Sequence, residues 1–296
     1  IIPYMLFFAD TALDISARLR SAQLAELETL SRHDYLITQF RVIVTYLRLI
    51  VLPVGQNLDY DMELSKSFFE PGVLASFLFI LLVFASALFV FIRAYRRDNG
   101  LLALASFGVI WFFATVSIES SIIPIKDIIF EHRLYLPSIG LAFGTSTLVF
   151  YSAEGFKVGR KRAVLVLALA AVALGAAAYS RNGVWADKLA LWKDIAGKSP
   201  NKARAHINLG LAYREMGLLN EAIAEYELAL TLEPDNPVLL NNMGVARLML
   251  GQAGEAVPFI EKALALKPDY EDARNSLGFA YFSLNRTDEA IAEYRE

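Results

Sequence analysis

The pattern of hydrophobic and polar positions divides the chain into two parts. In the first part, four long runs without a charged residue alternate with short polar loops. A helix needs about 20 consecutive apolar residues to cross the hydrocarbon core of a membrane, and these runs are about that long. We therefore expect four membrane-spanning helices, at residues 72–92, 100–118, 134–153 and 163–179.

The segment at residues 35–52 is also largely apolar, but it carries two arginines. Arg41 and Arg48 share one face of a helix, with Thr45 between them. An arginine at the centre of a bilayer costs about 2.5–3.5 kcal/mol on insertion scales. The segment is therefore expected either to be re-entrant or to span the membrane with this face lining a cavity. Pro53 ends its helix.

The second part of the chain repeats with a period of 34 residues. Glycine, alanine and proline recur at that period: Gly210, Gly244 and Gly278; Ala222, Ala256 and Ala290; Pro234 and Pro268. This is the tetratricopeptide (TPR) pattern, in which small residues let the two helices of a hairpin approach and proline ends the second helix. The repeats are expected at residues 203–236, 237–270 and 271–296, the last one truncated.

Residues 183–202 connect the two parts. Trp185, Leu189 and Trp192 form a helical stripe that predicts a linker with a capping helix for the repeats. The expected fold class is therefore all-α, with a multispanning transmembrane helix bundle in residues 1–182 followed by a TPR α-solenoid. Residue 1 is an isoleucine inside an apolar run, so we expect the chain to be part of a longer protein.

Composition and charge add a membrane orientation. The chain is 56% hydrophobic with a mean hydropathy of +0.42, and the repeats from residue 203 hold 8 Lys/Arg against 15 Asp/Glu. The loops after the first and third apolar runs hold seven Lys/Arg, whereas the loops at residues 53–71 and 119–133 hold three. The positive-inside rule places the basic loops in the cytoplasm. The other loops and the repeats then lie outside it, in the periplasm for a bacterial inner membrane.

Metal and redox chemistry find little support in the sequence. The chain has no cysteine, which excludes disulfides and thiolate metal sites. Its three histidines are scattered along the sequence, which argues against a zinc cluster. The sequence does not decide whether a divalent metal is needed, and no nucleic-acid partner is expected.

The stretch from Glu131 to Tyr135 brings several reactive side chains to one membrane surface. Transfer of a sugar from a polyprenyl phosphate needs a carboxylate to take the acceptor's proton and a cation to stabilise the departing phosphate. Arg133 can supply that cation, because guanidinium matches phosphate oxygens with two donors. His132 or Tyr135 can add a donor, and Glu131 can orient Arg133 or contact the acceptor. Equally, Glu131 and Arg133 can be an ion pair at the membrane edge, with Tyr135 as an interfacial anchor.

Other polar positions are weaker candidates. Arg41 and Arg48 can contact the lipid phosphate, or they can extend to the membrane interface. The carboxylates Asp59 and Asp61 can bind a metal or act as a base, but they also suit a solvated turn.

One position of the repeats is polar in all three. Asn208 and Asn242 occupy it in the first two repeats and Ser276 in the third. Such side chains can line the concave surface and bind an extended peptide backbone, or they can be structural polar positions. TPR arrays commonly bind peptides or partner proteins through that surface.

Several segments together resemble a known family. The segments TYLRLIVLPVGQNLDYD, EHRLYLPSIG and RNGVWADKLALWKDIAGKSPNKARAHINLG, followed by TPR repeats, resemble bacterial relatives of the transmembrane-and-tetratricopeptide (TMTC) protein O-mannosyltransferases. The resemblance implies a GT-C-type membrane glycosyltransferase that uses a polyprenyl-phosphate-linked sugar. It also implies that the catalytic acidic motif lies upstream of this chain, so no catalytic residue is assigned here. The asparagine positions resemble the peptide-guiding repeats of the nucleocytoplasmic O-GlcNAc transferase.

We therefore expect a protein O-glycosyltransferase fragment that transfers a sugar to Ser or Thr of extracytoplasmic proteins, with the repeats binding the acceptor or a partner. Two alternatives stay open. One is a membrane-anchored TPR scaffold for envelope, pilus or polysaccharide assembly. The other is an enzyme that ligates or polymerises lipid-linked glycans.

Overall fold

The computed structural model describes residues 31–120, 128–129 and 131–295, with the backbone alone at residues 119, 120 and 132. The first 30 residues of the predicted membrane domain therefore lie outside the described residues. The chain divides into two compact units, residues 1–177 and residues 178–296. The described elements are helical, so the expected all-α class is confirmed.

Within its described residues, the first unit contains five α-helices and one short 3-10 helix. They are α2 (Arg32–Val51), α3 (Pro71–Arg96), α4 (Gly100–Ser120), η1 (Glu131–Leu134), α5 (Tyr135–Gly155) and α6 (Arg160–Ala186), whose last turns continue into the second unit. Within the part of the chain that the structure describes, α3, α4, α5 and α6 are long and apolar enough to cross a membrane. These four helices overlap the four apolar runs of the sequence.

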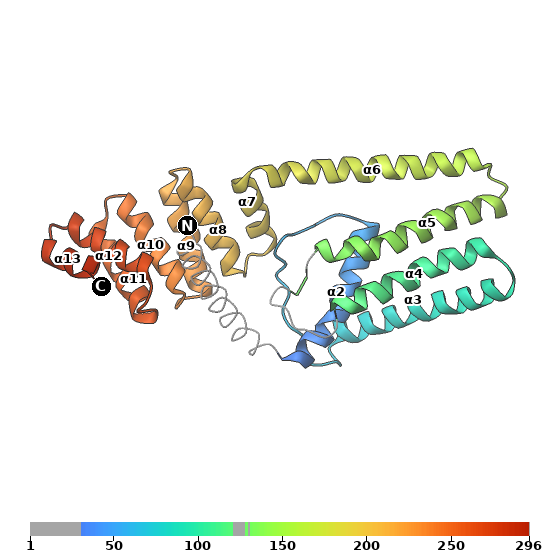
Figure 1. Cartoon of the computed structure of the whole chain (residues 1–296), viewed down its shortest axis with the longest axis horizontal. Helices are drawn as coiled ribbons and strands as arrows, with labels where there is room; N and C mark the ends of the chain where they lie inside the picture. Colours follow the sequence, from blue (N-terminus) through green and yellow to red (C-terminus); the bar gives the residue numbers. More distant parts are fainter. Residues whose placement is uncertain (1–30, 121–127, 130, 296) are drawn as a thin grey trace, which may run out of the picture. The chain divides into compact units, whose positions relative to one another are not determined.

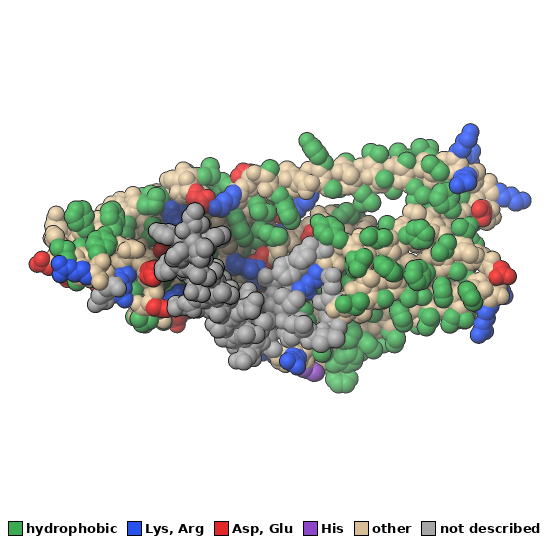
Figure 2. Space-filling view, viewed as in Figure 1, with side chains coloured by type: hydrophobic (Ala, Val, Ile, Leu, Met, Phe, Trp, Pro, Cys, Tyr) green, Lys and Arg blue, Asp and Glu red, His purple; other side chains and the backbone are tan. Residues whose placement is uncertain are grey.

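Basic residues gather at two turns of this unit. The α3–α4 and α5–α6 turns lie at one end of the bundle, whereas η1 and α2 lie at the other (Figure 1). Arg93 and Arg96 occupy the last turn of α3, where positive charge also suits the negative end of the helix dipole. Figure 2 shows Lys and Arg side chains gathered at the end with the two turns, and hydrophobic side chains over the helices between.

Helices α4 and α5 pack closely because glycines line their contact. A Cβ atom added to Gly108 would lie 2.3 Å from the Gly140 carbonyl oxygen, and one added to Gly144 would lie 2.8 Å from the Ala105 carbonyl oxygen. Gly140 and Gly144 are spaced as in the GxxxG motif, which lets helix backbones approach in a membrane. The indole nitrogen of Trp111 donates a 3.2 Å hydrogen bond to the Leu136 carbonyl oxygen. Together these contacts position the first turn of α5 beside α4.

Helix α2 runs crosswise to the ends of α3 and α4 (Figure 1). It is continuous over 20 residues, and the Ser31 hydroxyl caps its first turn. Its buried Val42 and Tyr46 pack with Phe112 and Val116 of α4 and with Leu134 of η1. This cluster therefore packs α2, α4 and η1 around one apolar core at this end of the bundle.

The second unit is a TPR array preceded by a short helix. Its helices are α7 (Lys188–Lys198), α8 (Ala203–Glu215), α9 (Leu219–Leu232), α10 (Pro237–Met249), α11 (Ala253–Leu266), α12 (Glu271–Ser283) and α13 (Thr287–Arg295). They form three hairpins, α8–α9, α10–α11 and α12–α13. The predicted solenoid is therefore confirmed.

The repeated glycines explain how each hairpin closes. A Cβ atom at Gly210 would lie 2.4 Å from the ring of Tyr226, and one at Gly244 would lie 2.4 Å from Ile260. A Cβ atom at Gly278 would lie 2.7 Å from the ring of Tyr294. Larger residues at these positions would push the second helix of the hairpin away.

Helix α7 packs on the first repeat. Ile195 and Ala196 form a small apolar cluster with Ala205 and Leu209 of α8. The Asp187 side chain caps the start of α7 by accepting from the Leu189 backbone nitrogen. The apolar face of α8 that starts the array is thereby covered.

Candidate functional site

Two polar loops meet at the Glu131 carboxylate. Its Oε1 atom accepts a 2.8 Å hydrogen bond from the Asn57 backbone nitrogen and a 2.7 Å hydrogen bond from the Tyr60 hydroxyl. Glu131 opens η1, while Asn57 and Tyr60 belong to the loop between α2 and α3. One carboxylate thus ties together segments more than 70 residues apart in sequence.

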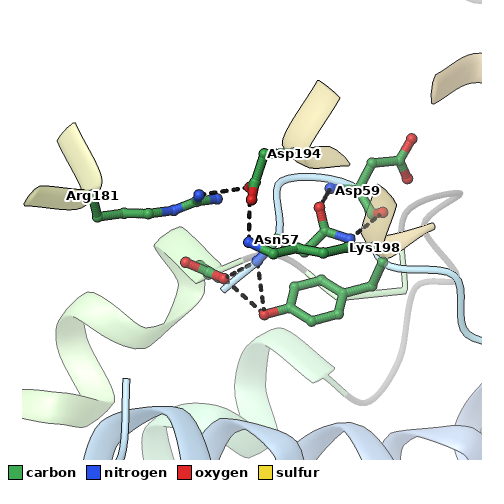
Figure 3. Close-up of polar contacts among 7 residues, drawn as sticks. Asn57, Asp59, Arg181, Asp194 and Lys198 are labelled. Atoms are coloured by element: carbon green, nitrogen blue, oxygen red, sulfur yellow. Dashed lines mark hydrogen bonds and ion pairs between the residues drawn. The ribbon is translucent and has the colours of Figure 1, made fainter. Parts of the chain in front are cut away.

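The loop has its own internal order at Asn57. The Asn57 side chain turns toward Asp59, donating from Nδ2 to the Asp59 carbonyl oxygen at 2.9 Å (Figure 3). Its Oδ1 accepts from the Asp59 backbone nitrogen at 3.4 Å. Both side chains are buried. Asparagine supports such turns because its amide reproduces backbone hydrogen bonds.

Tyr60 is held in its neutral form. Burial raises the pKa of the Tyr60 hydroxyl well above its ordinary value, and the hydrogen bond and negative charge of Glu131 raise it further. The positive charge of Arg48 opposes this shift in the pKa only weakly. The hydroxyl therefore remains a donor to Glu131 over the physiological pH range.

The neighbours of Glu131 differ in exposure. Arg133 is buried, with 7% of its surface exposed, whereas Tyr135 at the first position of α5 is 77% exposed. The side chain of His132 lies outside the described residues. A buried guanidinium is costly unless other groups satisfy it, which makes Arg133 part of the organised interior of this end of the bundle.

Arg41 and Arg48 bind the loop that follows their helix. The Arg48 guanidinium donates a 2.8 Å hydrogen bond to the Val54 carbonyl oxygen, and Arg41 donates a 3.1 Å hydrogen bond to the Ser65 hydroxyl. The Ser65 backbone nitrogen in turn donates to the Thr38 hydroxyl at 2.9 Å. The polar face of α2 therefore anchors the loop at two points.

The loop carboxylates are in different surroundings. Asp59 is buried and Asp61 is exposed. Within the described ranges, no group of three or more His, Asp and Glu side chains is arranged to hold a metal ion.

In the TPR array, the predicted ladder positions make mostly local contacts. Asn208 donates to the carbonyl oxygen of Arg204, and Ser276 donates to that of Asp272, each one turn earlier on its own helix. Asn242 is buried and accepts a 3.3 Å hydrogen bond from Arg214 of the preceding repeat.

The last turns of α6 are joined to α7 by charge. The carboxylate of Asp194 lies between the Arg181 guanidinium at 2.6 Å and the Lys198 amine at 2.8 Å (Figure 3). Burial opposes ionisation of Asp194, but the hydrogen bonds from Lys198 and Arg181 outweigh it and lower the pKa of this carboxyl.

The sequence did not predict the hydrogen-bond partners of Glu131. Tyr60 lies between Asp59 and Asp61, which were the predicted polar candidates of that loop. The sequence did not predict Ser65, which accepts a hydrogen bond from Arg41, or Thr38, which accepts one from the Ser65 backbone nitrogen. No local pattern marks these residues, because each contact joins segments that are distant in sequence.

Comparisons with known proteins agree with the repeats. Residues 210–251 match a family described as TPR repeat, and residues 247–296 match one described as tetratricopeptide repeat. Solved structures that match parts of the chain include the MamA protein, with 20% identity over 53% of this chain and 79% of that chain, at a TM-score of 0.36. Another is TTC0263, a thermophilic TPR protein of Thermus thermophilus, with 24% identity over 55% of this chain and 84% of that chain, at a TM-score of 0.34.

A curated relative extends the likeness beyond the repeats. Over 186 residues, 63% of this chain, the sequence is 26% identical to Protein O-mannosyl-transferase F38B6.6 of Caenorhabditis elegans. That stretch covers 26% of the relative, so the chain spans about a quarter of the relative's length. The chain is thus a TPR-containing protein with four candidate spans among its described residues and a distant similarity to an O-mannosyl-transferase.

Proposed function

We propose that this chain is the part of a membrane glycosyltransferase that binds a polyprenyl-phosphate-linked sugar and presents a protein acceptor to it. The sugar would pass to Ser or Thr of extracytoplasmic proteins. The observation that carries this proposal is the hydrogen-bonded junction of Glu131 with Asn57 and Tyr60, beside the buried Arg133. It lies at the end of the bundle away from the basic turns. The distant similarity to an O-mannosyl-transferase supports the same reaction class.

The side chains of the junction suit different tasks. Arg133 would stabilise the departing phosphate, because guanidinium stays charged and donates two parallel hydrogen bonds to phosphate oxygens. Arg48, which is exposed and near Tyr60, would add a second positive charge. Glu131 already accepts two hydrogen bonds, so we assign it the positioning of the two loops. The proton-abstracting carboxylate is not assigned to this chain.

The distribution of charge supports an orientation for this reaction. Seven Lys/Arg lie at the α3–α4 and α5–α6 turns, which the positive-inside rule places in the cytoplasm. The Glu131 junction, α7 and the TPR array would then lie outside it, in the periplasm of a bacterium. The TPR groove, with Asn208, Asn242 and Ser276, would bind the acceptor protein or a partner.

The test is mass spectrometry of glycopeptides from extracytoplasmic proteins, with variants made in the intact gene. Arg133→Lys keeps the positive charge but loses the two parallel N–H donors of the guanidinium, and Arg133→Ala loses both the charge and the donors. We expect Arg133→Ala to reduce the rate of sugar transfer by about 10²-fold, the usual loss when a transition-state donor is removed, and thereby to lower glycan occupancy. Arg133→Lys should fall between Arg133→Ala and the wild type.

Arg160→Lys, at the basic end, is the matched control and should leave occupancy unchanged. Normal occupancy in Arg133→Ala, at normal protein level in the membrane, would refute the phosphate role.

A second candidate is a membrane-anchored TPR scaffold for envelope, pilus or polysaccharide assembly. Exposed aromatic side chains of α12 favour it, since Phe279 and Phe282 are 52% and 62% exposed and offer an apolar contact. If the protein is a scaffold, deletion of the gene would abolish assembly. Returning a gene that carries Arg133→Ala to the deletion strain would then restore assembly fully.

A further inference from the structure

An apolar cavity opens between α3, α4 and α5. Its volume is about 540 Å³. Leu82 and Val90 of α3, Leu102 and Val109 of α4, and Leu141 and Leu148 of α5 contribute to its walls. The close approach of α4 and α5 at Gly144 brings the two helix backbones together at this cavity.

The cavity offers few polar groups to a ligand. Its lining residues include no charged side chain. The Ser106 hydroxyl donates to the Leu102 carbonyl oxygen at 2.7 Å, and the Thr145 hydroxyl donates to the Leu141 carbonyl oxygen at 2.8 Å. These two hydroxyls are satisfied within their own helices, and Ser86 supplies the third hydroxyl of the otherwise apolar lining, so the cavity suits a hydrocarbon ligand.

On α3 and α4 the cavity lies in the half of each helix nearer to the basic end. Its α3 residues lie between Leu82 and Val90, in the part of α3 nearest to the basic end. At 1.5 Å of rise per residue, Leu82 and Arg93 are about 16 Å apart along the helix axis, which is about half of a bilayer's hydrocarbon thickness. The cavity therefore has the depth of one lipid leaflet.

Positive charge lies at the headgroup end of this cavity. Arg93, Arg96 and Arg97 are all exposed there, with the acidic residues Asp98 beside them in sequence and Glu154 in the last turn of α5. The α5–α6 turn also carries Lys and Arg side chains at this end of the bundle, as Figure 2 shows, but α6 does not line the cavity. Such clusters attract anionic lipid headgroups.

We propose that this cavity holds an acyl chain of an anionic phospholipid, whose phosphate binds Arg93, Arg96 and Arg97. The apolar walls match the chain, their depth matches one leaflet, and the arginines match the headgroup charge. The proposed headgroup contact lies at the end of the bundle away from the Glu131 junction, so it is separate from the proposed donor site. It requires that the helices cross a membrane, but not that the protein transfers a sugar.

The experiment is native mass spectrometry of the full chain, released from detergent after equilibration with phosphatidylglycerol or phosphatidylcholine. We expect the protein to retain one phosphatidylglycerol molecule. Its dissociation constant should be at least about tenfold lower than that of phosphatidylcholine. Ser86→Trp, at the wall of the cavity, should abolish retention. Ala85→Trp is the matched control, because Ala85 is exposed on the same helix and does not line the cavity.

Two triple variants test the headgroup contact. Changing Arg93, Arg96 and Arg97 to Gln should remove the preference for phosphatidylglycerol, whereas changing Arg160, Lys161 and Arg162 to Gln should keep it. Equal loss in the two triple variants would show general surface attraction and overturn the proposal. So would unchanged retention in a Ser86→Trp protein of normal helix content. If Ser86→Trp does not fold, the pair of triple variants decides the question alone.

Discussion

The hydroxyl of Tyr60 donates a 2.7 Å hydrogen bond to Oε1 of Glu131, which lies 71 residues further along the chain. The same oxygen accepts from the Asn57 backbone nitrogen. Because Glu131 opens η1 and η1 leads directly into α5, this contact sets the α2–α3 loop against the start of a candidate membrane span. Arg133 is carried on that same short helix, so its position depends on the Tyr60–Glu131 pair.

Tyr60→Phe is therefore expected to loosen this end of the bundle. Loss of a hydrogen bond to a charged acceptor should lower the free energy of unfolding by about 1.5–3 kcal/mol. Thermal unfolding in detergent, followed by near-ultraviolet circular dichroism, measures the effect. The control is Tyr135→Phe, whose side chain is 77% exposed, and it should leave the midpoint unchanged. Equal midpoints for both variants would mean that the pair contributes nothing to stability.

Gly108→Ala is expected to disrupt the α4–α5 contact. Its Cβ would lie 2.3 Å from the Gly140 carbonyl oxygen, and the backbone on the other side cannot rotate away. Overpacking of this kind costs about 1–3 kcal/mol. The matched variant is Gly175→Ala in α6, where a Cβ would meet nothing within 4 Å. The unfolding midpoint should fall for Gly108→Ala and stay or rise for Gly175→Ala, and a similar fall for both would contradict the close approach.

Tyr226→Phe is expected to stabilise the TPR array. The Tyr226 hydroxyl is buried and lacks a hydrogen-bond partner within the described chain. Removing such a group should add about 1 kcal/mol to the free energy of unfolding. Tyr281→Phe should have the opposite effect, because the Tyr281 hydroxyl donates a 2.8 Å hydrogen bond to Glu261. Chemical denaturation of the full chain, read by far-ultraviolet circular dichroism, compares the two variants.

The buried Tyr226 hydroxyl also predicts that the free energy of unfolding depends on pH. Burial raises the pKa of Tyr226 from 10.0 to about 12. Between these two pH values the unfolded chain loses the Tyr226 proton while the folded chain keeps it, so stability falls as pH rises from 10 to 12. Tyr226→Phe removes this contribution and should reduce the slope of stability against pH in that interval. An unchanged slope would show that Tyr226 titrates alike in both states.

His206→Phe is expected to weaken the junction of α7 with the repeats. The His206 Nδ1 atom lies 2.7 Å from a carboxylate oxygen of Glu225, and Nε2 lies 3.0 Å from the Pro200 carbonyl oxygen. A carbonyl oxygen only accepts, so Nε2 carries a proton and donates it. Phenylalanine would fill the space but leave the Pro200 carbonyl oxygen without this donor, at a cost of about 2 kcal/mol.

Hydrogen exchange measured by mass spectrometry would locate that loss at residues 198–206. His33→Phe is the control, because His33 is exposed and contacts only the neighbouring Asp34 among its described partners. Protection at residues 198–206 that is equal in both variants would rule out the bridging role of His206.

The repeats and the four candidate spans were predictable for the same reason. Gly210 and Tyr226 meet within one hairpin, and each repeat contacts only its neighbours, so a 34-residue period carries nearly all the information. Within α3 and α4, a hydrocarbon environment demands that every backbone group bond within its own helix, so an uncharged run of sufficient length predicts a helix.

The candidate site was predictable only in part. The stretch from Glu131 to Tyr135 stood out because charge and aromatic side chains adjoin an apolar run. Its partners did not, since Tyr60 resembles any tyrosine in a polar loop. The two arginines of α2 were noted for sharing a face, but their acceptors at Val54 and Ser65 follow from the path of the loop. A loop without periodicity leaves no trace of that path in the sequence.

The sequence alone thus determined the elements whose contacts are local or periodic: the four apolar helices, the three TPR hairpins and the charge asymmetry of the turns. Only the tertiary structure decided which loop meets Glu131, how α2 crosses the bundle and where α3, α4 and α5 leave an apolar cavity. The physical reason is that hydrophobic runs and repeat periods act through near neighbours and backbone hydrogen bonds. The junction and the cavity arise from packing between distant segments, where each side chain's role depends on what the rest of the chain places beside it.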